Sequence, residues 1–231
     1  MGKRHASRSR PRVPPGRLLP EGVVKALENA QKELGEIGAK TALIGGLAVG
    51  ARTVPRTTRD VDFAVSVAND REAETIVQAL LRRDFQVQAT LEHTSGRLAT
   101  ARLTSPADRH VLVDLLFYFC GIEAEIVNQA SEIGAYPVAE RSHLLATKII
   151  AGRDEDLHDV TLLLAHMKAD ELRRAKQLLL LAEKRGFNAG RNLRQELKAL
   201  IARDRAANAS FRDNPARTRA LRRRAARSPA R

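Results

Sequence analysis

The sequence predicts an α+β protein, with a mixed β-sheet flanked by helices and followed by a helical C-terminal part. Two observations carry this prediction. Up to about residue 119, short apolar runs typical of strands alternate with amphipathic segments that have helical spacing. Beyond residue 141 only the helical spacing continues. The chain has 231 residues, 43% of them hydrophobic, which is enough to bury one sizeable core.

The expected elements follow from apolar spacing and from glycine, asparagine and aspartate at the ends of the segments. The segment 21–38 is an amphipathic helix that Gly38 would end, and Asn69 or Asp70 would cap a later helix. Up to the last strand we expect helix 21–38, strand 40–46, a helix from 47, strand 61–67, helix 70–84, a hairpin of 85–93 with 97–104, and strand 110–119. Helices are then expected within 142–167, 170–186 and 192–204.

The net charge of +13 is concentrated at the two ends of the chain. Residues 1–18 hold 6 basic and no acidic residues, and residues 203–231 hold 10 basic and 2 acidic ones. We therefore expect a disordered basic tail over 1–18 and a disordered Arg-rich tail over 209–231. Between them we expect a main domain over 19–166 and a helical region over 167–208. Such tails favour nucleic-acid phosphates, although they are also common as solvated extensions.

The single cysteine, Cys120, lies in an apolar run, so the chain forms no internal disulfide and we expect a buried reduced thiol. The basic N-terminus is not followed by an apolar stretch of signal-peptide type, and no run approaches the length of a membrane span. These features predict a cytoplasmic protein without a membrane partner.

Asp60 directly precedes the apolar segment VDFAV, and Asp62 lies within it. Side chains at positions i and i+2 of a strand point to the same face, so these carboxylates would project together. Like charges are tolerated there when a divalent cation lies between them, and carboxylate oxygens suit Mg²⁺ or Mn²⁺. The alternative is a pair on the solvated face of an edge strand.

Gly45 and Gly46 follow an apolar strand and precede a helix, where free N–H groups can bind phosphate oxygens. Asp114 is flanked by apolar residues in another strand, and a buried aspartate requires a metal ion or an ion pair. Its pairing with an arginine such as Arg102 or Arg109 is the alternative to metal binding. A phosphate-binding turn beside converging carboxylates is what a nucleoside triphosphate with its metal ion needs.

The segments ALIGGLAVGARTVPRTTRDVDFAV and LLATKIIAGRDEDLHDV resemble the AbiEii/AbiGii toxin family of nucleotidyltransferases, within the DNA polymerase β-like superfamily. The likeness covers about residues 22–165. It implies a nucleotidyltransferase-like fold and an enzyme that transfers a nucleotide from an NTP with release of pyrophosphate.

The resemblance also implies a role for each matching residue. Gly45 and Gly46 would bind the triphosphate, and Arg56 and Thr58 would support it or orient the first aspartate. Lys148 would contact nucleotide phosphates, although a lysine whose stem lies on a helix surface is the alternative. The remaining assignments are Asp60, Asp62 and Asp114 as metal ligands, Asp114 also as proton acceptor, and Asp156 and Asp159 as the acids of the second motif. Glu155 departs from the family, which commonly has a basic residue there.

The expected acceptor is a hydroxyl of RNA, such as a tRNA end, ahead of a protein side chain or a small molecule. The family likeness also implies a toxin with an antitoxin partner, which the site residues by themselves do not establish. A module that binds nucleotide or RNA without turnover is the alternative function.

Overall fold

The computed structural model describes residues 19–212, with side chains described as far as residue 206. A seven-stranded mixed sheet has the order β3-β4-β5-β2-β1-β7-β6. Its central strands combine an antiparallel β1–β2 pair with a parallel β2–β5 pair. The strands are β1 (Lys40–Leu43), β2 (Asp60–Ser66), β3 (Gln86–Glu92), β4 (Leu98–Ser105), β5 (Asp108–Leu116), β6 (Ser131–Ile133) and β7 (Tyr136–Val138).

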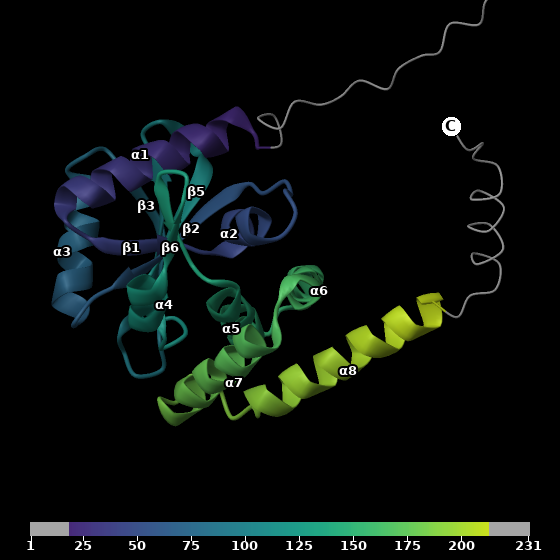
Figure 1. Ribbon diagram of the computed structural model, residues 1–231. Helices are drawn as coiled ribbons and strands as arrows, with labels where there is room; N and C mark the ends of the chain where they lie inside the picture. Colours follow the sequence, from purple (N-terminus) through teal and green to yellow (C-terminus); the bar gives the residue numbers. More distant parts are fainter. Residues whose placement is uncertain (1–18, 213–231) are drawn as a thin grey trace, which may run out of the picture.

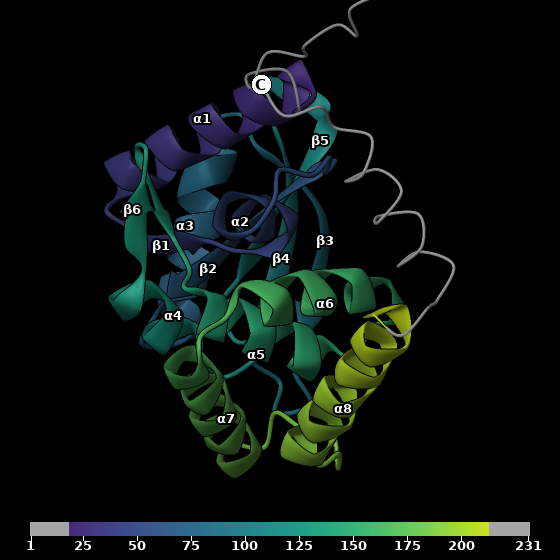
Figure 2. The ribbon, with the colours of Figure 1, turned by 45° about the vertical axis from the view of Figure 1, so that its right-hand side comes forward.

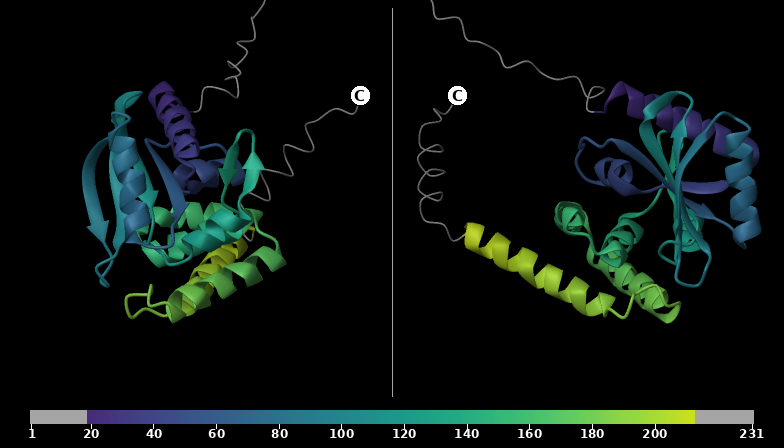
Figure 3. Two further views of the ribbon diagram at one scale, coloured as in Figure 1. Left: turned by 90° about the vertical axis from the view of Figure 1, so that its left-hand side faces the viewer. Right: turned by 180° about the vertical axis from the view of Figure 1, so that it is seen from behind.

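The helices cover the sheet unequally. They are α1 (Glu21–Ile37), α2 (Gly45–Arg52), α3 (Asp70–Leu81), α4 (Glu123–Gln129), α5 (Arg141–Ala151), α6 (Leu157–His166), α7 (Ala169–Lys184) and α8 (Leu193–Arg212), with a 3-10 turn at Asp154–Asp156. Figures 1 and 2 show α5 to α8 together on the side of the molecule away from α1. The two views in Figure 3 show the same helical layer beside the sheet, and α5 packs against both α7 and α2.

The predicted fold class, a mixed sheet with flanking helices and a helical C-terminal part, is confirmed. Gly38 ends α1 in the left-handed conformation, and the Asn69 side chain caps α3 by accepting a hydrogen bond from the Glu72 amide. The hairpin β3–β4 also forms as predicted. None of the helices within residues 19–212 is both long and apolar enough to cross a membrane.

Three features differ from the sequence prediction. The elements α4, β6 and β7 lie where no element was expected. Gly152, in the left-handed conformation, separates α5 from α6 within the segment 142–167. The last helix, α8, continues to Arg212, four residues into the predicted tail 209–231, and otherwise both predicted tails lie outside the described residues.

An aromatic cluster ties the β3–β4 hairpin to the loop between α7 and α8. The Phe187 ring stacks on His93 with ring centroids 4.4 Å apart and meets Tyr118 edge-on at 4.6 Å. The Arg97 guanidinium lies 3.8 Å above the Tyr118 ring. The two Phe187 contacts, one stacked and one edge-on, hold the α7–α8 loop against the sheet.

His143 is fully buried in α5, and neither ring nitrogen has a hydrogen-bond partner among the described residues. Burial lowers the pKa of His143 to about 4, and Arg174 adds to this, while Glu140 and Glu125 oppose it. Between pH 6.5 and 4 the unfolded chain therefore binds a proton that the folded protein does not.

His143 should therefore not reduce the free energy of unfolding above pH 6.5. As the pH falls from 6.5 to 4, it should lower that free energy by about 3 kcal/mol. Urea denaturation across this pH range should show a flatter profile for His143→Gln than for the parent protein. An equal change at the exposed His110 is the control, and identical slopes for both variants would refute the assignment to His143.

Candidate active site

One cavity of about 400 Å³ gathers the glycines, carboxylates and basic residues that were predicted to form the site. It lies where β2 and β5, the start of α2, and the turn between α5 and α6 meet. Of the predicted site residues, Gly45, Gly46, Arg56, Thr58, Asp60, Asp62, Asp114, Lys148, Asp156 and Asp159 line it. Three segments that are distant in the sequence, 45–62, 102–119 and 147–159, therefore form one site.

The carboxylates converge because of the strand register. In the parallel β2–β5 pair, Asp62 lies directly beside Asp114, and Asp60 is two residues before Asp62 on the same face. Burial and then the negative charges of Asp60 and Asp114 raise the pKa of Asp62 to about 7, against a smaller opposing effect of Lys148 and Arg153. The cavity thus holds a carboxylate whose negative charge is poorly compensated.

Glycines are needed at positions 45 and 46 because side chains there would collide with Asp62 and crowd Thr58. Gly45 has φ +63°, and a Cβ atom there would lie 1.8 Å from Asp62 Oδ2. A Cβ on Gly46 would lie 3.0 Å from Thr58 Oγ1, and that hydroxyl donates a hydrogen bond of 2.7 Å to Asp60. The backbone at the N-terminus of α2 can approach the two aspartates closely only because these positions lack side chains.

Gly45→Ala should therefore destabilise the protein by more than the strain of placing alanine at a positive φ. We expect a cost of about 1–2 kcal/mol for alanine at positive φ, plus about 1–3 kcal/mol for displacing Asp62. Gly38→Ala is a matched control, because Gly38 has φ +77° and nothing within 4 Å of its Cβ position. Equal losses in chemical denaturation for the two variants would contradict the close approach to Asp62.

The second motif forms a buried ion-pair network rather than a helix face. Lys148 Nζ bonds Asp156 and lies 3.0 Å from Asp159 Oδ2, and its side chain is only 10% exposed. Arg56 bonds Asp159, and Arg153 bonds Asp156 at 3.1 Å. The break at Gly152 turns the chain so that Lys148 and both acids meet across it. Lys148 is therefore not the surface lysine of the alternative interpretation.

Asp114 forms an ion pair with an arginine. Arg102, which is opposite Asp114 in the β4–β5 register, donates to both of its carboxylate oxygens at 2.8 and 2.7 Å. The alternative from the sequence, an arginine pair for Asp114, is thus present, with Arg102 and not Arg109. Both oxygens of Asp114 already accept one hydrogen bond, so any metal ion would have to use their remaining lone pairs.

Three further basic side chains, to which the family resemblance gave no role, line the cavity. Arg59, Arg102 and Arg153 all line the cavity, and all three are exposed. Of these, only Arg102 was named from the sequence, as a possible ion-pair partner of Asp114. Glu155, at the position that departs from the family, is exposed and pairs with Arg153 at 3.3 Å.

The donor set suits Mg²⁺ or Mn²⁺. Six acidic and five basic side chains line the cavity. A bound cation would offset the excess of negative charge, which would otherwise repel a triphosphate. Within the described residues, no group of three or more histidine, cysteine or acidic side chains is arranged to hold a metal ion. Mg²⁺ commonly binds through one or two carboxylates together with water and substrate phosphates. Asp60 and Asp62 fit that role.

No protein-family model matches the chain, and no curated protein does. Several solved structures share part of its fold. The structure of ANT(2")-Ia with adenylyl-2"-tobramycin matches with 15% identity and TM-score 0.45 over 69% of this chain and 95% of that one. The lincomycin-bound lincosamide adenylyltransferase LnuA matches with 12% identity and TM-score 0.43, over 65% and 100% of the two chains.

A cytoplasmic RNA terminal U-transferase matches with 20% identity and TM-score 0.36, over 61% of this chain and 37% of that one. Likeness at these levels assigns neither an activity nor a substrate to this chain.

Proposed function

We propose that this protein is a metal-dependent nucleotidyltransferase. The observation that carries the proposal is the single cavity in which Asp60 and Asp62 lie against the glycine pair at the N-terminus of α2. A paired carboxylate for a divalent cation and a helix N-terminus for phosphate are the two devices that an NTP with its metal ion needs.

Each residue then has a role. Asp60 and Asp62 would hold Mg²⁺ or Mn²⁺, with Asp114 as a third ligand through its remaining lone pairs. The amides at Gly45 and Gly46 would bind phosphate oxygens, and Thr58 orients Asp60. When bound, the metal ion supplies charge neutralisation of the triphosphate.

The residues of the second motif, Lys148, Asp156 and Asp159, would bind the nucleotide from the α5–α6 side of the cavity. Lys148 would donate to the phosphates, and Asp156 and Asp159 fix its ammonium in the cavity. Arg56 is held by Asp159 at the same wall.

In the proposed reaction an acceptor hydroxyl oxygen forms a bond to the α-phosphorus of the NTP. The bond from that phosphorus to the bridging oxygen of the β-phosphate breaks, and pyrophosphate leaves with the electron pair. The hydroxyl proton passes to a carboxylate of the cavity, for which Asp114 is the candidate. Catalysis then consists mainly of positioning and electrostatic stabilisation.

We propose RNA, such as a tRNA end, as the acceptor, ahead of a protein side chain or a small hydroxyl compound. The cationic ends of the chain support this choice because arginine-rich segments bind phosphate backbones. Membership of the AbiEii/AbiGii family, a toxin role with an antitoxin partner and a cytoplasmic location rest on the sequence alone.

The Arg102–Asp114 ion pair favours a second candidate, a module that binds nucleotide without turnover. Incubation of the protein with each α-labelled NTP, Mg²⁺ and either total RNA or a protein extract separates the two. Label in RNA supports the first proposal with its acceptor, and label in protein supports transfer with another acceptor. Nucleotide binding without any transfer supports the binding module.

A further inference from the structure

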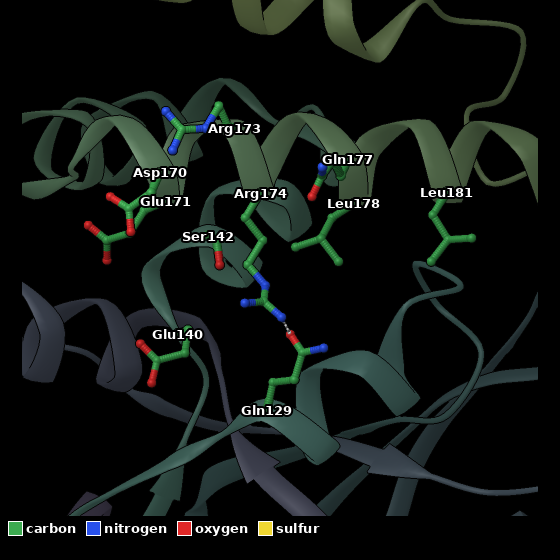
Figure 4. Close-up of a pocket in the computed structure, with 10 residues that line it drawn as sticks. All are labelled: Gln129, Glu140, Ser142, Asp170, Glu171, Arg173, Arg174, Gln177, Leu178 and Leu181. Atoms are coloured by element: carbon green, nitrogen blue, oxygen red, sulfur yellow. Dashed lines mark hydrogen bonds between the residues drawn. The ribbon is translucent and has the colours of Figure 1, made fainter.

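A second cavity, of about 760 Å³, lies between α7, the end of α4 and the beginning of α5 (Figure 4). It shares no lining residue with the candidate active site. Arg174 extends from α7 across this cavity and donates a hydrogen bond to Gln129 of α4. The remaining N–H donors of its guanidinium have no partner among the described side chains.

The start of α5 presents further unfilled donors here. Ser142 is 2% exposed and lines the cavity, yet its hydroxyl has no hydrogen-bond partner within the described residues. Figure 4 shows the Ser142 side chain pointing into the space between Glu140 and Arg174. No side-chain cap is present on α5, and in the described part of the chain neither the Arg141 nor the Ser142 amide has an acceptor; of these two residues, Ser142 lines the cavity. The Ser142 hydroxyl is not among the fully buried side-chain atoms that lack a partner, so it is open to the cavity and to a ligand there.

The acidic side chains of the cavity are mostly neutralised by other arginines. Glu140 pairs with Arg52 at 3.1 Å, and Glu171 pairs with Arg141 at 2.9 Å. Asp170 is exposed in the first turn of α7, at the side of the cavity away from Leu178 and Leu181 in Figure 4. The positive charge of Arg174 beside Ser142 therefore remains available to an anion.

We propose that this cavity binds a phosphate group, as inorganic phosphate or as a phosphate monoester. A guanidinium, a hydroxyl and the free amides of a helix N-terminus are the donors that recognise phosphate oxygens. The remaining volume, next to Leu178 and Leu181, leaves room for the organic part of a monoester. Phosphate binding at this cavity does not depend on nucleotidyl transfer at the other one.

The site would lie at the opposite end of α5 from the active site. Lys148 follows Ser142 by six residues, which is about 9 Å along a helix axis. A phosphate bound here would therefore be separate from the one that Lys148 contacts.

Isothermal titration calorimetry of the full chain with inorganic phosphate and with AMP tests the proposal. Arg174→Gln should weaken binding by at least about tenfold, the effect of losing a hydrogen bond to a charged group. Ser142→Ala should weaken it by a smaller factor. Both variants should keep the circular dichroism spectrum of the parent, because Arg174 is exposed and alanine fits a helix.

Two matched variants control for charge. Lys176→Gln removes a positive charge from the same helix outside the cavity, and Arg153→Gln removes one from the candidate active site. Both should bind phosphate at this site as the parent does. The proposal is overturned if neither phosphate nor AMP binds at millimolar concentration, or if Arg174→Gln binds both as tightly as Lys176→Gln. Loss of all binding in Arg153→Gln would equally overturn it, because the phosphate would then occupy the active site.

Discussion

Asp62→Asn should abolish nucleotidyl transfer while leaving the protein folded. Asp62 lies between Asp60 and Asp114 in the cavity, so removing its charge weakens the proposed metal site directly. We expect a loss of at least about 10²–10³ in rate, the scale for removing one group that stabilises charge in a transition state. Asp84→Asn, in the exposed turn after α3, is the matched control and should transfer at the parental rate.

The same substitution should not reduce stability. The pKa of Asp62, about 7 in the folded protein, is above its ordinary value of 3.8. The folded state thus binds more protons than the unfolded state between these values, and stability falls as the pH rises through this window.

Without divalent ions, Asp62→Asn should be level with the parent at pH 4 and more stable at pH 8, by at most about 4 kcal/mol. Thermal denaturation in EDTA at both pH values measures this. A variant less stable than the parent at pH 8 would show that the carboxylate holds the fold together and would remove the argument for an uncompensated charge.

Lys148→Ala should lose both nucleotide affinity and stability. Its ammonium lies between two buried aspartates, and removing one member of a buried ion pair costs about 3 kcal/mol or more. If Lys148 also contacts the triphosphate, affinity or turnover should fall by about 2–4 kcal/mol. Arginine should rescue poorly, because a planar fork does not replace a compact ammonium.

A double variant separates the two effects. Lys148→Met combined with Asp156→Asn removes one charge of each sign and should recover most of the stability, whereas nucleotide binding should stay weak. The shift of the melting temperature on adding NTP and Mg²⁺ reports binding in each variant. A double variant with the parental shift would make Lys148 a purely structural residue.

The sequence could indicate which residues would lie together because several of the signals are local. The two-residue period of a strand is enough to put Asp60 and Asp62 on one face, and a glycine pair before a helix is visible in the sequence. That Asp114 lies beside Asp62 depends on a parallel pairing of two distant strands, which the sequence could only suggest.

Other features depend on contacts that no local pattern encodes. The meeting of Lys148 with Asp156 and Asp159 needs the change of chain direction after Gly152, whereas the helical period predicts only helices within 142–167. The strands β6 and β7 have only three residues each, too few to show an alternating pattern. The cavity beside Ser142 is formed by α4, α5 and α7 together and had no signal in the sequence.

Two labels on the NTP distinguish whether the Asp60–Asp62 cavity transfers the α-phosphate, with its nucleoside, to an acceptor. Purified protein is incubated with Mg²⁺, RNA and an NTP labelled at either the α- or the γ-phosphate. We predict that the α-label alone becomes attached to RNA, that the γ-label is released as pyrophosphate, and that Asp62→Asn does neither. Release of the γ-label as inorganic phosphate, or α-transfer that persists in Asp62→Asn, would contradict the assignment.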